Sequence, residues 1–215
     1  MFGFAVSGGY EMNKWIGEAL RNPNARITGA VYLLYFLTAI FAEVFVSQKL
    51  IVYGDATNIV AYLFYSILTL LFYLMFKPVS RGLSLFAALV SLAGCAVGVL
   101  GLFSLAPTQI SPLLFFGFYC LLIGYLIFRS TFLPRILGAL MAFAGLGWLL
   151  FMSPPIARDL SLCIEVLGVV AEATLMLWLL VMGVNVRQWK EQTIAAEKLP
   201  SFAAAVRVRS RREPI

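Results

Sequence analysis

Long apolar stretches without Lys or Arg dominate the hydrophobic pattern of this chain. At a rise of about 1.5 Å per residue, a helix made from each stretch would cross most or all of a hydrocarbon core about 30 Å thick. The stretches lack the alternation of apolar and polar residues seen in the strands of membrane barrels, so they predict helices. The predicted fold is an all-α, polytopic transmembrane bundle of six helices, at residues 27–46, 58–76, 83–106, 113–128, 136–152 and 162–184.

Basic residues fall almost entirely on one side of this predicted bundle. Of the 16 Lys and Arg residues, only Lys49 and Arg158 lie in connections on the other side. Positive residues stay on the cytoplasmic side of a membrane, so we expect both termini in the cytoplasm. The bundle at 27–184 would then lie between a cytoplasmic segment at 1–26 and a basic cytoplasmic tail at 185–215.

Composition supports a membrane protein. Hydrophobic residues make up 62% of the chain and charged residues only 12%, whereas about a quarter of a soluble domain is charged. The mean hydropathy of +0.94 is correspondingly high. We therefore expect a multi-pass protein of the cell (inner) membrane.

The two terminal segments carry predictions of their own. Residues 1–26 lack the pattern of a cleaved signal peptide, and residues 10–21 have the apolar spacing of a short interfacial helix. Residues 186–199 are expected to continue the last span, and the remainder to be irregular. Basic residues near the C-terminus are either a topology anchor or a contact for anionic lipid: Arg207, Arg209, Arg211 and Arg212. They belong to no recognisable nucleic-acid-binding fold, so we expect no nucleic-acid partner.

Residue types that are absent or isolated exclude several kinds of catalytic and metal site. The chain contains no histidine, which excludes a Ser-His-Asp triad, an HExxH site and a His-ligated haem. The three cysteines lie in or at the ends of spans, where they predict neither disulfides nor zinc ligands, so we expect no cofactor and no metal. Six glycines in the spans predict close packing of helix backbones: Gly94, Gly98, Gly101, Gly138, Gly145 and Gly147.

Three acidic residues inside the predicted spans are the candidate functional residues. Glu172 lies near mid-depth of the last span, and Glu165, seven residues earlier, shares its face. Glu43 of the first span lies at about the depth of Glu165. If the first and last spans are neighbours, all three carboxyl groups could line one outward-opening cleft.

No basic residue lies within any span to neutralise Glu172. The remaining options are a neutral, protonated carboxyl, a water-filled cavity, or a basic side chain that reaches in from a loop, for which Lys49 and Arg158 are the candidates. A purely structural role is a further option, in which Glu172 hydrogen-bonds a tyrosine or a carbonyl. Nine hydroxyl-bearing residues are candidate partners: Tyr32, Tyr35, Thr38, Tyr62, Tyr65, Ser66, Thr69, Tyr119 and Tyr125.

Three phrases resemble a known bacterial family. They are GYLIFRSTFLPRILG within residues 116–150, LWLLVMGVN within 169–185, and RITGAVYLLYFLTAIFAEVF at 26–45. The chain resembles the integral membrane family called domain of unknown function 4386 over roughly residues 20–190. The resemblance implies a six-helix membrane protein, a glutamate before the Leu-Trp-Leu-Leu phrase at Glu172, and no established activity. Many family members carry arginines inside the second and third spans, which this chain lacks.

Three functional classes remain open. A non-enzymatic membrane protein that binds a lipid or a partner accounts for all of these features and is the leading interpretation. A small proton- or cation-coupled transporter would use Glu172 as its site. An enzyme acting on a lipid-type substrate would use an outward-facing pair of carboxyl groups, Glu43 and Glu165, as acid and base.

Overall fold

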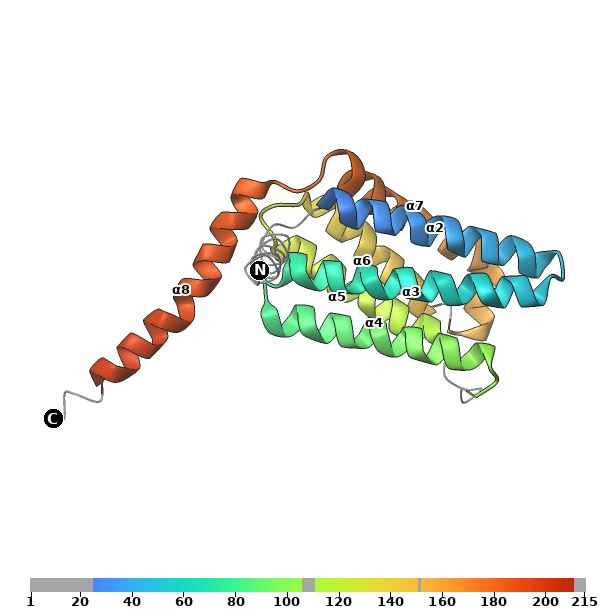
Figure 1. Cartoon of the computed structure of the whole chain (residues 1–215), viewed down its shortest axis with the longest axis horizontal. Helices are drawn as coiled ribbons and strands as arrows, with labels where there is room; N and C mark the ends of the chain where they lie inside the picture. Colours follow the sequence, from blue (N-terminus) through green and yellow to red (C-terminus); the bar gives the residue numbers. More distant parts are fainter. Residues whose placement is uncertain (1–24, 106–110, 151, 211–215) are drawn as a thin grey trace, which may run out of the picture.

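The computed structural model describes residues 25–105, 111–150 and 152–210, with the backbone alone for 154–158 and 199–210. Within these residues the chain forms seven helices and no strand, which confirms the all-α prediction (Figure 1). The predicted interfacial helix at 10–21 lies outside the described residues. The helices are α2 (Ala25–Ser47), α3 (Ile51–Phe76), α4 (Arg81–Leu102), α5 (Pro112–Arg129), α6 (Arg135–Leu150), α7 (Pro154–Val181) and α8 (Val186–Ser210).

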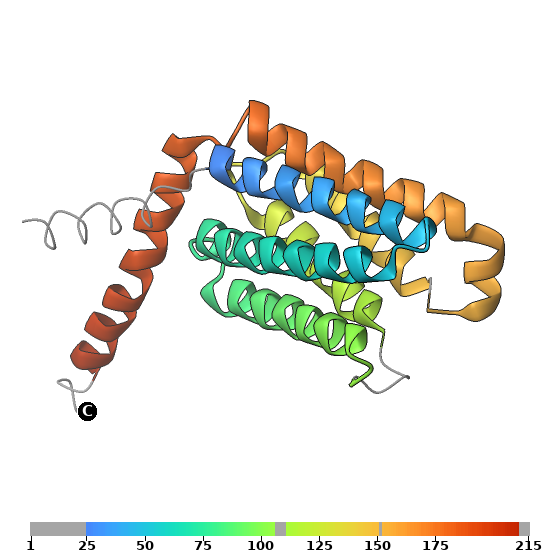
Figure 2. The same ribbon diagram turned by 45° about the vertical axis from the view of Figure 1, so that its right-hand side comes forward.

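Helices α2 to α7 form a closed ring. Each packs against the helix that follows it in the chain, and α7 returns to pack against α2. The two views agree that α2 and α7 lie side by side although they stand at opposite ends of the bundle sequence (Figures 1 and 2). Neighbours in the ring are antiparallel, so we distinguish the α8 end, where α7 passes into α8, from the distal end, where α2 turns into α3.

Length and composition qualify five of the helices as membrane spans. These are α2, α3, α4, α5 and residues Asp159–Val181 of α7. Helix α6 is equally apolar but has only 16 residues, about 24 Å of helix.

Several helix ends differ from the predicted spans because apolar content does not mark where a helix stops. Helix α3 begins at Ile51, seven residues before the predicted start, and includes the polar residues Asp55 and Thr57. Helix α4 ends at Leu102 instead of 106, since Ser104 takes a left-handed conformation (φ +56°). The amide of the next residue, Leu105, then bonds the Leu100 carbonyl and closes the helix end.

The last span and the tail depart most from expectation. The tail was expected to continue the last span and then become irregular, but α7 stops at Val181 and a separate helix, α8, runs to Ser210. Gly183 adopts φ +72° and its amide bonds the Trp178 carbonyl, which terminates α7. The Asn185 side chain then accepts a bond from the amide of Gln188 at 3.2 Å and starts the new helix. Helix α8 leaves the ring at a steep angle (Figure 1).

Glycine pairs set the contact between α5 and α6. A Cβ on Gly138 would lie 2.8 Å from the Gly124 carbonyl oxygen, and one on Gly145 would lie 2.7 Å from that of Gly117. Side chains at these positions would force the two backbones apart, so the prediction of close packing is confirmed for Gly138 and Gly145. Gly101 differs, because a Cβ there would meet nothing within 4 Å.

The α8 end of the ring is filled by packed side chains. Large residues from α3, α5 and α7 are almost fully buried there, namely Leu68, Phe72, Met75, Phe76, Leu126, Ile127, Leu175 and Leu179. Trp189 of α8 closes this core, since its indole N–H donates to the Met75 carbonyl at 3.0 Å. The hollow part of the ring is therefore in its distal half.

Candidate functional site

A cavity of about 610 Å³ lies inside the ring, and residues from all six helices α2 to α7 line it. It reaches from the middle of α7 toward the distal ends of the helices. The three predicted acidic residues, Glu43, Glu165 and Glu172, all line this one cavity. Because α2 packs against α7, the adjacency on which the predicted cleft depended is present.

Glu172 forms the floor of the cavity. Its side chain is only 5% exposed, and the Tyr32 hydroxyl of α2 donates to Oε2 at 3.0 Å. Among the described residues, no hydrogen bond reaches its other oxygen, Oε1. Glu172 thus both holds α7 against α2 and presents one carboxylate oxygen at the cavity.

Glu43 and Glu165 form the mouth. Glu43 lies four residues before the end of α2, and Glu165 lies two turns before Glu172 on α7. Both side chains are exposed and line the same cavity as Glu172. The enzyme hypothesis required a polar cavity that joins these two carboxyl groups. Both line one cavity, but its walls are mainly apolar.

Four of the six aromatic rings that line the cavity follow one another from helix to helix, and we call them the aromatic arc: Tyr35, Tyr65, Phe116 and Trp148. Each comes from a different helix, and successive ring centroids are 4.8, 5.7 and 5.6 Å apart. Gly168 of α7 makes room for the last of them, since a Cβ there would lie 2.6 Å from the Trp148 indole. The arc gives the cavity a continuous aromatic face.

No Lys or Arg side chain lines the cavity in the described structure. Lys49 lies exposed in the α2–α3 turn, and the side chain of Arg158 is outside the described residues. The ion pair found among the described residues is Arg187 with Glu191, on the exposed face of α8. The carboxyl groups that line the cavity therefore face no cation that the structure describes there.

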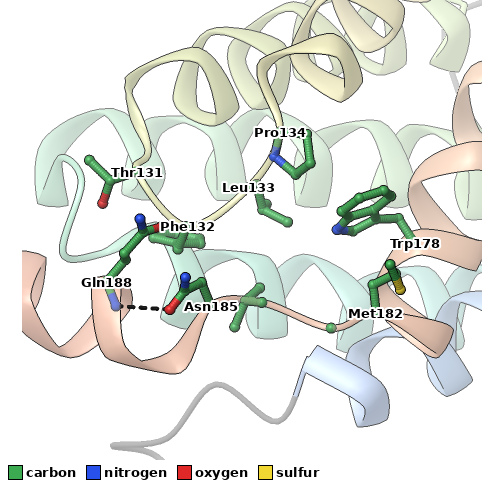
Figure 3. A pocket seen from close by; sticks show the side chains of 10 residues that line it. Thr131, Phe132, Leu133, Pro134, Trp178, Met182, Asn185 and Gln188 are labelled. Carbon is green, nitrogen blue, oxygen red and sulfur yellow. Dashed lines mark hydrogen bonds between the residues drawn. The ribbon is translucent and has the colours of Figure 1, made fainter.

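A second hollow, of about 470 Å³, lies at the α8 end (Figure 3). Residues 131–134 between α5 and α6 form one side, and residues 182–185 between α7 and α8 form the other. Asn185 and Gln188 lie at its edge, where the Asn185 side chain accepts the bond from the Gln188 amide that caps α8 (Figure 3). The buried core beneath Glu172 separates this hollow from the cavity, and no residue lines both.

The acidic residues chosen from the sequence line one cavity, and one of the candidate partners is in contact with Glu172. Tyr32 was one of nine candidate partners for Glu172, and it is the one that the structure shows. Phe116 and Trp148 were missed, because an aromatic residue in an apolar helix is unremarkable until the fold shows which face it occupies. Tyr125, another candidate partner, instead lies half exposed beside Arg129.

Comparisons with known proteins give a family resemblance over part of the chain but no activity. An uncharacterised protein from Archaeoglobus fulgidus is 27% identical over 119 residues, which cover 52% of this chain and 72% of that protein. No solved structure gives a significant match. The expected resemblance is confirmed over α5, α6 and α7, which hold Glu165 and Glu172: residues 108–183 match the family described as domain of unknown function (DUF4386).

Proposed function

We propose that this chain is a six-span membrane protein that binds an amphiphilic ligand, lipid or lipid-like, in the cavity of the helix ring and does not transform it. The observation that carries the proposal is the cavity itself. Its volume of about 610 Å³ lies within the roughly 300–1,000 Å³ typical of small-molecule sites. Its walls are mainly apolar and aromatic, with a few polar groups that converge at the floor and the mouth.

The ring supports six spans in spite of the short α6. Helix α5 ends at the α8 end and α7 begins at the distal end, so the chain must travel the length of the bundle between them. Helix α6 makes that passage while packed against both neighbours. A bilayer adapts to a short apolar helix by local thinning, at a modest cost in free energy.

The charges support a cytoplasmic α8 end. Among the side chains that the structure describes, Lys49 is the basic residue of the distal end. The α8 end carries Arg26, Lys77, Arg81, Arg129, Arg135, Arg187, Lys190 and Lys198. By the positive-inside rule, the cavity then opens on the outer side of the membrane, and both termini lie inside.

Two neighbouring valines of α7 provide a matched test of ligand binding. Val169 lines the cavity, whereas Val170 is equally exposed but does not line it. We expect Val169→Trp to fill the cavity and abolish retention of lipid, while Val170→Trp behaves as the wild type. Native mass spectrometry of protein exposed to vesicles of total bacterial lipid measures the retained ligand. Equal retention by both variants would place the bound lipid outside the cavity and contradict the proposal.

Proton- or cation-coupled transport is the second candidate, and the position of Glu172 favours it. A carboxyl group near the middle of a span that faces a cavity is the usual form of an intramembrane ion site. The hollow at the α8 end supplies a second vestibule on the other side of the packed core. Liposomes that contain this protein would then show a cation or proton flux that is lost in Glu172→Gln.

A further inference from the structure

We propose that the ligand of the cavity is an organic cation, such as an amine or quaternary ammonium group that carries apolar substituents. This inference rests on the proposed function, because it names the chemistry of a ligand that the cavity binds. It draws on the free oxygen of Glu172, the aromatic arc and the charge of the lining residues.

Glu172 supplies the counter-charge. Tyr32 satisfies Oε2, while Oε1 has no hydrogen-bond partner among the described residues and its side chain lines the cavity. A carboxylate in apolar surroundings is costly unless a positive or hydrogen-bonding group faces it. A cation at the floor would provide that group without displacing Tyr32.

The aromatic arc supplies the second element of the site. Cations are attracted to the faces of Tyr, Trp and Phe rings, and clusters of such rings bind quaternary ammonium groups. Tyr35 and Tyr65 lie at the end of the arc nearer Tyr32, since the Tyr32 and Tyr35 rings are 6.1 Å apart. The arc therefore begins beside the carboxyl group of Glu172 and extends along the wall.

The lining residues are a poor match for anionic ligands and for metal ions. Three carboxyl groups and no described Lys or Arg line the cavity, which disfavours a fatty-acid carboxylate or a phosphate group placed beside Glu172. A divalent metal ion is also a poor fit. Divalent cations take about six oxygen ligands, and the described residues contain no cluster of three His, Cys, Asp or Glu side chains able to hold a metal ion.

Benzyltrimethylammonium and neopentylbenzene provide a direct test. The two probes have nearly the same shape, because a carbon in the second replaces the charged nitrogen of the first. Equilibrium dialysis of the purified full-length protein in detergent, corrected with empty micelles, measures binding of each probe. We expect the cation to bind and the neutral probe to bind roughly tenfold more weakly.

Two pairs of variants locate the binding. Glu172→Gln is expected to weaken binding of benzyltrimethylammonium roughly tenfold. Glu191→Gln, on the exposed face of α8, is its control. Phe116→Leu keeps Glu172 but removes one ring of the aromatic arc, and is expected to weaken binding of the cation about threefold. Phe118→Leu on the same helix, outside the cavity, is its control. The Phe116 pair keeps the test decisive if Glu172→Gln does not fold.

The outcomes separate this inference from the proposed function. Equal binding of the two probes, both blocked by Val169→Trp, would overturn the preference for a cation and leave the cavity as a binding site. Retention of lipid without binding of the cation would also overturn the inference alone. If neither probe binds and no lipid is retained, the inference and the proposed function are overturned together.

Discussion

The contact between Tyr32 and Glu172 joins two residues 140 positions apart, at the place where the first and last helices of the ring meet. The hydroxyl satisfies one oxygen of a carboxyl group that is only 5% exposed. At this position one hydrogen bond serves two purposes, since it ties α2 to α7 and fixes the direction in which the second oxygen points.

Removing that hydroxyl should destabilise the folded protein. Tyr32→Phe leaves both oxygens of Glu172 without a partner in the described structure, and we expect it to lower the free energy of unfolding by about 1–3 kcal/mol. Thermal unfolding of the purified protein in detergent measures the change. Tyr53→Phe is the control, because Tyr53 is 65% exposed. Equal effects of the two substitutions would show that the bond contributes nothing to stability.

Single residues could be placed from sequence only along the membrane normal. Counting residues along a helix gave the depths of Glu43, Glu165 and Glu172, and the seven-residue spacing put the last two on one face. The partner of Glu172 could not be chosen in the same way. Choosing Tyr32 among nine hydroxyl-bearing residues requires the neighbour and rotation of each helix, which one sequence does not contain.

At the scale of elements, the α2–α7 seam depends on one glycine. A Cβ on Gly29 of α2 would lie 2.6 Å from the backbone nitrogen of Leu180 on α7. Backbone atoms cannot move aside as a flexible side chain can, so this position requires glycine for the two helices to touch.

A pair of alanine substitutions tests that seam. Gly29→Ala should destabilise the protein by about 1–3 kcal/mol through overpacking. Gly82→Ala, where a Cβ meets nothing within 4 Å, should instead stabilise α4 by up to about 1 kcal/mol through helix propensity. Thermal unfolding of the two variants gives opposite shifts if the seam is as close as described. A neutral or stabilising Gly29→Ala would show that α2 and α7 are not in backbone contact.

The position of each helix of the ring was predicted well, but the residues at which the helices begin and end were predicted poorly. Apolar runs located every helix of the ring, because the interior of a span must be apolar on nearly all sides. They could not show that α3 extends to Ile51 or that α8 is a separate helix. Those boundaries depend on capping and on left-handed residues such as Gly183, which leave little trace in hydropathy.

At the scale of the whole molecule, the ring has most of its basic side chains at one end and its cavity toward the other. Basic side chains cluster at the α8 end, and Glu43 and Glu165 mark the mouth in the distal half. The distribution of Lys and Arg in the sequence predicted the basic end, and the depths of the acidic residues suggested a cleft at the other end. The closure of α7 onto α2 was only a hypothesis, because the order of helices around a bundle is not encoded in their hydropathy.

Reporter fusions test the orientation. A fluorescent protein fused after residue 215 should fluoresce, because the C-terminus is expected in the cytoplasm. Alkaline phosphatase inserted in the α2–α3 turn at Lys49 should be active, since that enzyme requires the outer side of the membrane. Phosphatase activity at the C-terminus with none at Lys49 would invert the assignment and turn the cavity toward the cytoplasm.

The closed ring also has one joint that differs from the rest. Its other neighbouring helices are consecutive in the chain, so a connection limits how far they can separate, whereas none joins α2 directly to α7. Parting these two helices would open the ring sideways to the lipid while every connection stayed intact. Tyr32 and Glu172, which lie on the two sides of this joint, would be the first polar groups that an amphiphile arriving from the bilayer meets.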